Sequence, residues 1–486
     1  MSARVFMSAT AIVEVVRGRT MAELRTARDA AVGDIVELRL DGVSDIDVAG
    51  ALDGRRRPVI VTCRAVWEGG SFDGDERTRL GVLAEAIRLG AEFVDVEWKA
   101  DRRELPTNER TTVVLSHHDF SGMPADLAER VRAMAAELPG VLKIAVTPAR
   151  LSDCIVLRDA MRSDAPHVAI AMGPMGQLTR LCPGLFGSRW TYGGTAAPGQ
   201  VTATELRDVY RVGQQSRATA IYGVAGLPLG HSASPAMHNA AMASLGMDAV
   251  YVPFETAGAI ELLDVATAVG AIGLSVTAPL KTGVFAQVPR HDELSARIGA
   301  LNTLRRDNGG WEGRNFDVAG FLAPFVRRGL SLEGRRAVVL GAGGAARTAV
   351  WALQSQGARV EVAARRLDAA RALAEEFQVG VSDWPPPPGW DLLVNTTPVG
   401  TWPHVDASPL DADRVRDGVV YDLIYNPEET ALLAAARAHG ADVIGGLDML
   451  VGQACHQFEW WTGRTAPRDV MVSAARAFLA RMQEQV

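Results

Sequence analysis

Lys143 stands in the middle of an apolar run, Val141 to Val146, that has the length and composition of a buried strand. Burial and nearby cations lower the pKa of an amine, and a neutral amine can attack a carbonyl carbon. His118 ends another such run, and Glu68 lies in a Trp-Glu-Gly-Gly turn. Together, an amine, an imidazole and a carboxylate indicate a lyase or aldolase that forms a Schiff base. Taken alone, the lysine could face water on an edge strand, and the histidine could be a core or capping residue.

A second chemical pattern lies in a glycine-rich turn far along the chain, made of Gly341, Ala342, Gly343, Gly344, Ala345 and Ala346. The spacing G-x-G-x-x-A after a short apolar strand is a form of the dinucleotide fingerprint, in which a pyrophosphate meets a helix N-terminus. Arg365 and Arg366 follow the next predicted strand, and a basic pair there suits the 2′-phosphate of NADP. Glu361 could be the acid of an NAD site, but it falls inside that strand. A purely structural turn is the alternative.

A third set combines a lysine and an aspartate with hydroxyl and amide donors: Ser232, Ser234, Thr277, Lys281, Asn302 and Asp317. A Lys–Asp pair among such donors could transfer a proton beside a polyhydroxylated acid. The two serines precede a predicted helix and could instead be N-caps, and each fragment alone is more typical of a turn.

The first 212 residues must position the lysine site, and short apolar runs alternate there with helical patterns. We expect strands at residues 4–10, 34–40, 58–63, 93–98, 112–116, 141–146, 167–172 and 189–193. Strict alternation favours a parallel sheet, and about eight strands in so short a span favour a closed (βα)8 barrel over an open sheet. Barrel enzymes hold their chemistry where the strands end, and Glu37, Arg39 and Arg64 also fall there.

Composition limits the function classes. The chain of 486 residues can form two to four domains, and its net charge of −7 argues against a nucleic-acid or anionic-membrane partner. Glu14 interrupts the nearest candidate signal peptide, and four scattered cysteines form no C-x-x-C pair. We therefore expect a soluble cytoplasmic protein without a metal site or a disulfide framework. The oligomeric state stays open.

The first half resembles the type I 3-dehydroquinate dehydratases. The resemblance rests on Glu37-Leu38-Arg39, Arg64 with Glu68-Gly69-Gly70, Ser116-His117-His118-Asp119-Phe120, Lys143-Ile144-Ala145, Arg180 and Pro198-Gly199-Gln200. It implies a (βα)8 barrel in which Lys143 forms an imine with the substrate ketone, while His118, oriented by Glu68, moves the proton. Arg180 would hold the substrate carboxylate, and the ring hydroxyls would be positioned by Glu37, Arg39, Arg64 and Gln200. Ala196 stands where the family often has Ser, so one hydrogen bond of the lid is expected to be missing.

From about residue 219 the chain resembles the shikimate dehydrogenases. Besides the loops already named, the resemblance rests on Asn395-Thr396-Thr397, Tyr425-Asn426-Pro427 and the segment Gly446 to Gln453. It implies substrate contacts from Ser232, Ser234, Thr277, Asn302, Asp317, Tyr425 and Gln453, with proton transfer by Lys281 and Asp317. The implied NADP site consists of Gly341, Ala342, Gly343, Gly344, Ala345, Arg365, Arg366, Asn395 and Thr396. Phe316 replaces the usual Thr, and Thr401-Trp402 replaces the usual Met after Gly400.

The two resemblances imply a fusion of two enzymes that act in aromatic amino acid (chorismate) biosynthesis. We expect a dehydratase barrel in 1–216, a substrate-binding domain in 217–320, a Rossmann NADP-binding domain in 321–444, and a C-terminal segment, 445–486, that returns to the substrate-binding domain. Dehydration of 3-dehydroquinate would give 3-dehydroshikimate, which NADPH would reduce to shikimate. Two alternatives remain: a second module that prefers quinate or NAD, and a non-catalytic ligand-binding regulator. Ser232 and Ser234 favour shikimate, and the complete set of proton-transfer residues argues against a regulator.

Overall fold

The computed structural model describes residues 10–137, 140–162, 164–194, 201–416 and 418–484. The chain folds into two compact units, one made of residues 1–231, 247–271 and 278–280, and one of residues 232–246, 272–277 and 281–486. The finer division at residues 216, 320 and 444 stays a prediction. None of the helices in the described ranges is both long and apolar enough to span a bilayer.

Eight parallel strands form a barrel in the first unit. They are β1 (Ala11–Val16), β2 (Ile35–Arg39), β3 (Val59–Thr62), β4 (Phe93–Glu97), β5 (Thr112–Asp119), β6 (Val141–Val146), β7 (His167–Ala171) and β8 (Trp190–Gly193). Their order is β7-β6-β5-β4-β3-β2-β1-β8, and a single bridge between His167 and Ser188 joins the two ends. The expected (βα)8 barrel is therefore confirmed, with a seam between β7 and β8.

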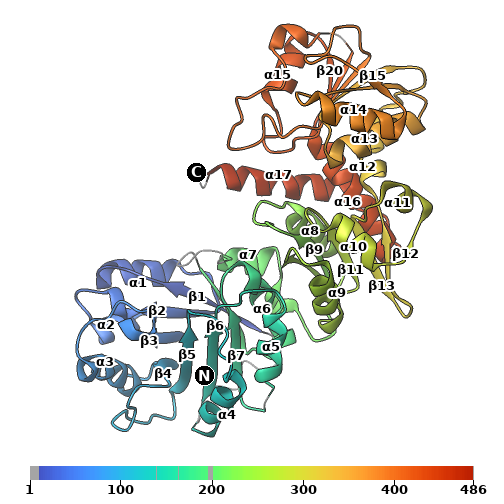
Figure 1. The fold of residues 1–486 in the computed structure, drawn as a ribbon. Helices are drawn as coiled ribbons and strands as arrows, with labels where there is room; N and C mark the ends of the chain where they lie inside the picture. The colour runs from blue at the N-terminus through green and yellow to red at the C-terminus, as the bar shows by residue number, and fades with distance from the viewer. Residues whose placement is uncertain (1–9, 138–139, 163, 195–200, 417, 485–486) are drawn as a thin grey trace. The chain divides into compact units, whose positions relative to one another are not determined.

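Helices surround these strands on the outside (Figure 1). They are α1 (Met21–Ala30), α2 (Val48–Leu52), α3 (Glu76–Arg88), α4 (Leu127–Ala136), α5 (Asp153–Ala160), α6 (Gln177–Leu181) and α7 (Ala203–Asp208), with short 3-10 turns such as η3 (Val66–Glu68). Because a strand points its side chains to alternate faces, Val59 and Val61 pack toward the helices while Ile60 fills the barrel interior. Strands covered on both faces are mostly apolar, which is why the sequence runs are so clear, and the few charged residues within them, such as Asp95 and Lys143, stand out.

The first strand differs from the expectation. Residues 4–9 of the strand expected at 4–10 lie outside the described residues, and the barrel begins with Ala11–Val16 instead. Glu14 makes this segment look interrupted in the sequence. Its carboxylate accepts hydrogen bonds from the backbone N–H groups of Val32 and Gly33, at 2.6 and 2.8 Å, so a charge is tolerated within the strand.

The first unit also contains β9 (Ala220–Gly226) and β10 (Ala249–Glu255), which pair in parallel, and α9 (Ala259–Ala268). The second unit begins with α8 (Ser234–Ser244), β11 (Gly273–Val276), α10 (Lys281–Gln287), β12 (Arg290–His291), α11 (Glu293–Ile298), β13 (Thr303–Asp307), β14 (Gly310–Arg314) and α12 (Asp317–Arg328). Strands β11, β13 and β14 are successively antiparallel. This arrangement brings the loops before β13 and α12 together.

A doubly wound sheet follows in the second unit. Its parallel strands are β15 (Arg336–Leu340), β16 (Arg359–Ala363), β17 (Gly380–Val381), β18 (Leu392–Asn395), β19 (Val419–Asp422) and β20 (Asp442–Ile444), and its helices are α13 (Gly344–Ser355), α14 (Leu367–Phe377) and α15 (Ala431–Ala438). The strand order is β17-β16-β15-β18-β19-β20, so the winding direction reverses between β15 and β18. Ligands bind at such a switch point in open parallel sheets, and the turn at Gly341 follows β15 there. The expected Rossmann arrangement is confirmed.

The chain ends with two long helices, α16 (Gly446–Thr462) and α17 (Arg468–Glu484), drawn in red in Figure 1. Helix α16 approaches α12 so closely that a Cβ on Gly320 would lie 2.7 Å from the Cβ of Gln453. Farther along α16, the indole Nε1 of Trp461 donates to the carbonyl of Leu304 at 2.9 Å. Helix α16 thus packs beside α12 and β13.

Two candidate active sites

Lys143 projects into the barrel interior. It lies two residues from Val141 and from Ala145 on β6, so all three side chains point to the same face of the strand, and Val141 and Ala145 belong to the interior cluster. It lines a cavity of about 330 Å³ at the carboxyl ends of the strands. Its Nζ lies 2.9 Å from Asp95 Oδ2 and 4.4 Å from the centroid of the Tyr192 ring. The alternative of a water-facing lysine is excluded, since only 4% of the residue is exposed.

The electrostatics of Lys143 differ from the expectation. Burial lowers the pKa of its ammonium group, but the carboxylates of Asp95 and Glu37 act more strongly in the other direction and leave the pKa raised. The expected lowered pKa is therefore wrong, because β4 brings a buried carboxylate to the amine. We infer that the amine must give up a proton, and its pairing with Asp95, when it attacks a carbonyl carbon.

Asp95 contacts several groups of this site, and no sequence motif pointed to it. Its Oδ1 accepts from Arg64 Nη2 at 2.7 Å and from Ser116 Oγ at 2.6 Å. Burial raises the pKa of Asp95, but the positive charges of Arg64 and Lys143 hold it well below the usual range. One signal was present: Asp95 and Glu97 alternate inside an apolar strand, as Glu37 and Arg39 do on β2.

The geometry of His118 suits its predicted role as a general base. Its Nδ1 lies 3.0 Å from Glu68 Oε1, and the same oxygen accepts the backbone N–H of His118 at 2.8 Å. Burial, with the positive charges of Arg64 and Lys143, holds the pKa of His118 well below its ordinary value. A neutral ring whose Nδ1–H is donated to Glu68 keeps a lone pair on Nε2, and this nitrogen can take a proton. Phe120 stacks on the ring with centroids 6.1 Å apart.

Glu68 is expected to give this site a pH dependence. Burial raises the pKa of Glu68 to about 7. Below that pH its carboxyl can donate its own proton to Nδ1, which moves the imidazole hydrogen to Nε2 and removes the base. We expect kcat/KM of the lysine-dependent reaction to fall as the pH drops below about 7 and to level off above it.

The measurement is a pH profile of kcat/KM for wild-type protein and Glu68→Gln, between about pH 5 and pH 9. The glutamine oxygen can still accept both N–H groups of His118 but does not titrate, so the variant should lose this limb of the profile. If the variant keeps the limb at the same pH, Glu68 is not the titrating group.

Arg180, on α6, has the surroundings expected of its predicted role in binding the substrate carboxylate. It is buried, its Nη1 donates to the carbonyl of Tyr192 at 3.3 Å, and its Nε has no partner in the described part of the chain. Burial lowers the pKa of Arg180 to about 10. Among the described residues no carboxylate forms an ion pair with Arg180, so its guanidinium can donate two hydrogen bonds to a substrate carboxylate.

The other predicted ring-binding residues line the same cavity where the structure describes them. Glu37 accepts from Thr62 Oγ1 at 2.7 Å, and Arg39 is bidentate with Asp41 at 2.8 Å. Gln200 and Ala196 lie outside the described residues. The exposed Arg17 also lines the cavity, and no sequence motif pointed to it.

The second unit contains the predicted proton-transfer pair. Lys281 and Asp317 begin α10 and α12, and Lys281 Nζ lies 2.6 Å from Asp317 Oδ2. Asn302 Nδ2 donates to the other carboxylate oxygen at 2.8 Å. The side chain of Lys281 is 34% exposed and that of Asp317 15%, so a substrate can reach the pair. A proton can therefore pass between a bound hydroxyl and the lysine.

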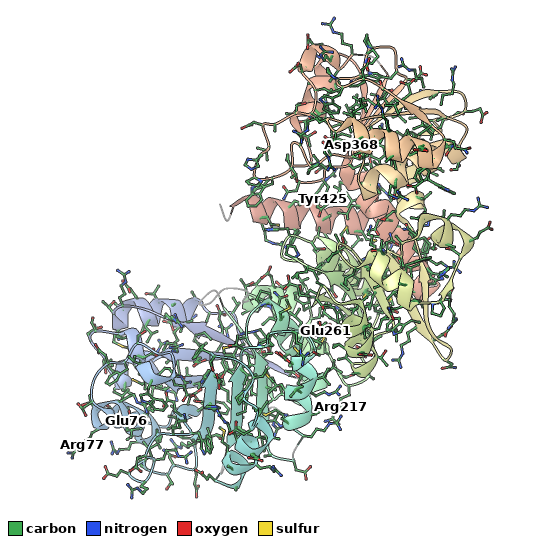
Figure 2. All side chains as sticks on the ribbon, viewed as in Figure 1. Glu76, Arg77, Arg217, Glu261, Asp368 and Tyr425 are labelled. Atoms are coloured by element: carbon green, nitrogen blue, oxygen red, sulfur yellow. The ribbon has the colours of Figure 1, made fainter. Side chains whose placement is uncertain are left out.

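The remaining predicted substrate residues lie in the same unit. Ser234 is the first residue of α8, whose N-cap is Ala233, so the N-cap alternative does not hold for Ser234. Ser232 Oγ accepts from the backbone N–H of Ser234 at 3.3 Å. Thr277 follows β11 and is partly exposed, and Tyr425 lies in the loop after β19, labelled in Figure 2. Gln453 lies on α16 and donates to the carbonyl of Leu450 at 3.0 Å.

The structure describes both departures from the shikimate dehydrogenase pattern. Phe316 is the N-cap residue of α12 and stacks on His456, with ring centroids 6.0 Å apart. The Thr401-Trp402 segment is tied to the loop of Tyr425: Thr401 Oγ1 and the Trp402 N–H both donate to the carbonyl of Asn426, at 3.2 and 2.9 Å. Of these two bonds, only the one from the Thr401 hydroxyl depends on the substitution, and it helps to hold the loop that carries Tyr425.

The glycine turn fits a dinucleotide. Gly341 has φ +110°, and a Cβ there would lie 2.7 Å from Thr396 Oγ1, so this position favours glycine. Gly343 and Gly344 are exposed at the start of α13, and no side chain caps this helix. Free helix N-terminal amides with no Cβ above them suit a pyrophosphate.

The side chains near the ribose position favour NADP. Arg365 and Arg366 are exposed after β16, and the described residues include no ion-pair partner for either. Glu361, the competing acid, is bidentate with Arg336 at 3.0 Å for both bonds. It is therefore not free to bind a ribose hydroxyl.

Asn395 and Thr396 hold the turn with their side chains. Asn395 Nδ2 donates to Asp422 Oδ1 at 2.9 Å, and its Oδ1 accepts from Thr397. Thr396 Oγ1 donates to the carbonyl of Leu340 at 2.6 Å. Since both side chains are committed to the turn, we expect this segment to meet the cofactor through its backbone.

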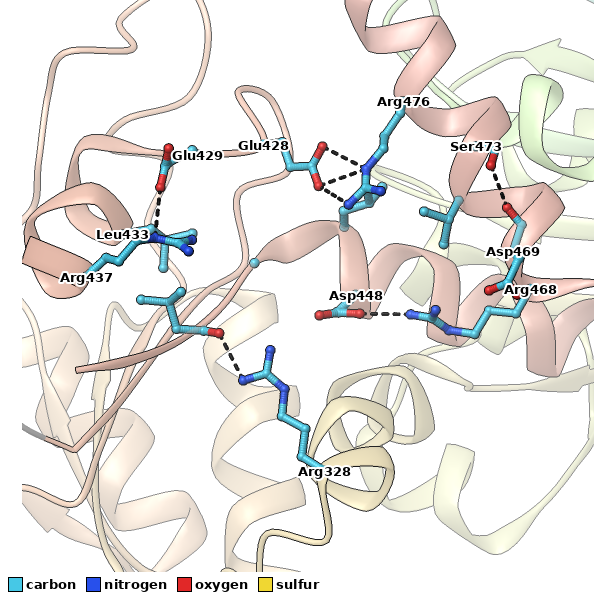
Figure 3. Close-up of a pocket in the computed structure, with 14 residues that line it drawn as sticks. Arg328, Glu428, Glu429, Leu433, Arg437, Asp448, Arg468, Asp469, Ser473 and Arg476 are labelled. Carbon is cyan, nitrogen blue, oxygen red and sulfur yellow. Dashed lines mark hydrogen bonds and ion pairs between the residues drawn. The ribbon is translucent and has the colours of Figure 1, made fainter. Parts of the chain in front are cut away.

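A second cavity, of about 890 Å³, lies beside β20, α15 and α17 (Figure 3). Its charged lining residues are four arginines and four acids: Arg328, Arg437, Arg468, Arg476, Glu428, Glu429, Asp448 and Asp469. Arg476 lies 2.7 Å from Glu428, and Arg468 lies 2.8 Å from Asp448. These charges neutralise one another, so the cavity does not indicate an ionic ligand.

The fold and the two sites define a bifunctional enzyme, with a barrel lyase followed by a dinucleotide-dependent dehydrogenase. Residues 12–217 match the family described as type I 3-dehydroquinase, residues 224–304 the shikimate dehydrogenase substrate binding domain, and residues 446–476 the shikimate 5′-dehydrogenase C-terminal domain. The Arabidopsis thaliana protein named bifunctional 3-dehydroquinate dehydratase/shikimate dehydrogenase, chloroplastic, is 30% identical over 480 residues, which are 90% of this chain and 79% of that protein. The chain belongs to this bifunctional family.

Two further relatives cover the second half. The shikimate dehydrogenase (NADP(+)) of Methanothermobacter thermautotrophicus is 40% identical over 281 residues, covering 54% of this chain and 98% of that protein. The crystal structure of shikimate 5-dehydrogenase from Thermus thermophilus, in complex with NADP(H) and shikimate, is 38% identical with a TM-score of 0.50. It covers 53% of this chain and 99% of its own.

Proposed function

We propose that this chain catalyses two consecutive reactions, the dehydration of 3-dehydroquinate to 3-dehydroshikimate and the NADPH-dependent reduction of that product to shikimate. The observation that supports the proposal is that one chain contains two separate sets of residues whose geometry suits proton transfer. Lys143 and the His118–Glu68 pair line one cavity, and Lys281 is bonded to Asp317 in the unit that holds the dinucleotide turn. The product of the first reaction is the substrate of the second.

In the barrel, the amine of Lys143 would add to the substrate ketone and expel water, giving a protonated imine. The imine makes the adjacent C–H acidic, and His118 Nε2 would take that proton to form an enamine. The enamine electrons then expel the neighbouring hydroxyl group, to which His118 returns the proton, so a second water leaves. Hydrolysis of the imine releases the product and restores the lysine. Arg180 would hold the substrate carboxylate throughout.

In the second unit, Lys281 would give a proton to the ketone oxygen as it becomes a hydroxyl, with Asp317 holding the lysine in place. NADPH, when bound at the glycine turn, supplies the hydride. Ser232, Ser234, Thr277, Asn302, Tyr425 and Gln453 would position the ring and its carboxylate. The imine and a cytoplasmic location stay predictions.

A coupled assay tests the whole proposal. Purified protein given 3-dehydroquinate and NADPH should consume NADPH and form shikimate without any added enzyme. Formation of 3-dehydroshikimate alone would leave only the dehydratase, and no reaction of either kind would favour the non-catalytic regulator.

The cofactor preference is tested by replacing Arg365 and Arg366 with glutamine. Each arginine can form a charge-assisted bond with the 2′-phosphate, so the double variant should raise KM for NADP on the order of tenfold to a hundredfold. KM for NAD, which lacks that phosphate, should change by no more than about twofold. Steady-state shikimate oxidation with each cofactor gives both values. An equal loss for NADP and NAD would contradict the assignment and reopen the NAD alternative.

The quinate alternative is tested with the same protein. Rates of oxidation of shikimate and quinate are compared at equal concentration with NADP, and shikimate should be preferred. A preference for quinate would revise the substrate but not the proton-transfer residues.

A further inference from the structure

A chain of buried polar side chains leads from α16 to the proton-transfer pair. Gln457 on α16 is 1% exposed. Its Nε2 donates to the carbonyl of Asn302 at 3.3 Å and to Thr303 Oγ1 at 2.9 Å. Its Oε1 accepts from Ser275 Oγ at 2.7 Å. Neither Gln457 nor Thr303 belongs to the predicted substrate or catalytic residues.

Each bond of this chain has a fixed direction. The carbonyl of Asn302 can only accept, so the NH₂ end of Gln457 must face it. Thr303 Oγ1 accepts from Gln457 and therefore directs its own hydrogen to Asn302 Oδ1, at 2.6 Å. The Phe316 N–H donates to the same oxygen at 2.9 Å. Two donors at Oδ1 leave Asn302 only one orientation, with Nδ2 toward Asp317.

The orientation of Asn302 matters for Lys281. Asn302 Nδ2 occupies one oxygen of Asp317 at 2.8 Å, and Lys281 Nζ occupies the other at 2.6 Å. If the Asn302 amide turned over, its oxygen would face the carboxylate and repel it. The carboxylate could then rotate away from Lys281, and the distance needed for proton transfer would be lost.

We propose that Thr303 and Gln457 are positioning residues of the dehydrogenase reaction, acting through Asn302 on Asp317 and Lys281. The inference rests on the proposed shikimate dehydrogenase function and adds two residues to it. Ligand contact by Asn302 would depend on the same orientation, since its amide faces the pair.

The test compares Thr303→Val with Thr303→Ser. Valine has nearly the shape of threonine but no hydroxyl, whereas serine keeps the hydroxyl and loses a methyl group. Thr303→Val should lower kcat of shikimate oxidation about tenfold to a hundredfold, with KM for NADP unchanged. Thr303→Ser should stay within about threefold of the wild-type protein. The dehydratase rate of the same preparation should not change, because its residues lie in the other unit.

A second comparison separates positioning from simple packing. Gln457→Met keeps the length of the side chain and removes both donors, and it should lower kcat as Thr303→Val does. In a Lys281→Ala background, Thr303→Val should have almost no further effect, because the residue on which it acts is absent.

Two results would overturn the inference: a Thr303→Val variant as active as the wild-type protein, or a Thr303→Ser variant as weak as Thr303→Val. A full additional loss in the Lys281→Ala background would also contradict it. Wild-type protein that does not oxidise shikimate with NADP would overturn the proposed function itself, whatever the variants do.

Discussion

Replacement of Lys143 by alanine is expected to lower the rate of dehydration by a factor on the order of 10⁴ or more. The cavity that holds Lys143 contains arginines but no second lysine among its described lining residues, and a guanidinium is not a nucleophile at neutral pH. Without the amine no imine forms, and the adjacent C–H stays too weak an acid for His118. The absorbance of the conjugated product measures the rate. Shikimate oxidation by the same variant should be unchanged.

Borohydride identifies the amine directly. The sequence contains three lysines, Lys99, Lys143 and Lys281. Variants of Lys99 and Lys281 therefore serve as controls for every lysine other than Lys143. Reduction in the presence of 3-dehydroquinate should add the substrate mass to Lys143 in wild-type protein and in the exposed-residue control Lys99→Ala. An adduct that persists in Lys143→Ala would assign the imine to another residue.

Replacement of Lys281 by methionine is expected to slow shikimate oxidation on the order of 10²- to 10⁴-fold. Methionine keeps an unbranched chain of similar length but has no proton to exchange and leaves Asp317 without its partner at 2.6 Å. The rate is followed as NADPH absorbance, and the dehydration rate should be unaffected.

Lys281→Arg separates proton transfer from ion pairing. Arginine can keep an ion pair with Asp317, but its pKa is too high for it to exchange a proton at neutral pH. We expect this variant to be nearly as slow as Lys281→Met. A variant with the wild-type rate would show that charge alone is needed, and equal slowing of dehydration would contradict two independent sites.

The parts of the barrel that the sequence predicted are those with local signals. An apolar strand covered on both faces has a recognisable composition, so most strands were located to within about two residues. The first strand was misplaced because Glu14 interrupts its apolar run, and only the neighbouring loop reveals the two N–H partners of that carboxylate. The family motifs likewise identified Lys143 and His118 as site residues, but they did not predict the distances between these residues and their partners.

The features that were not predicted are those set by contacts distant in sequence. The raised pKa of Lys143 follows from Asp95, which lies 48 residues away on β4. Gln457 meets Thr303 across 154 residues. Asp95 and Gln457 belong to no sequence motif. The barrel and the packing of α16, rather than local spacing, bring each of them to its partner.

The pair between Arg336 and Glu361 limits how this enzyme could be redesigned for NAD. An acid is needed at the ribose, and Glu361 looks available in the sequence, yet both of its oxygens are bonded to Arg336 at 3.0 Å. Releasing it would break a link between β15 and β16, the two strands that carry the phosphate turn and the basic pair. A new acid at position 365 would leave that link intact. Cofactor exchange in this scaffold is therefore a question of adding a charge at the strand end, not of reusing the charge already present.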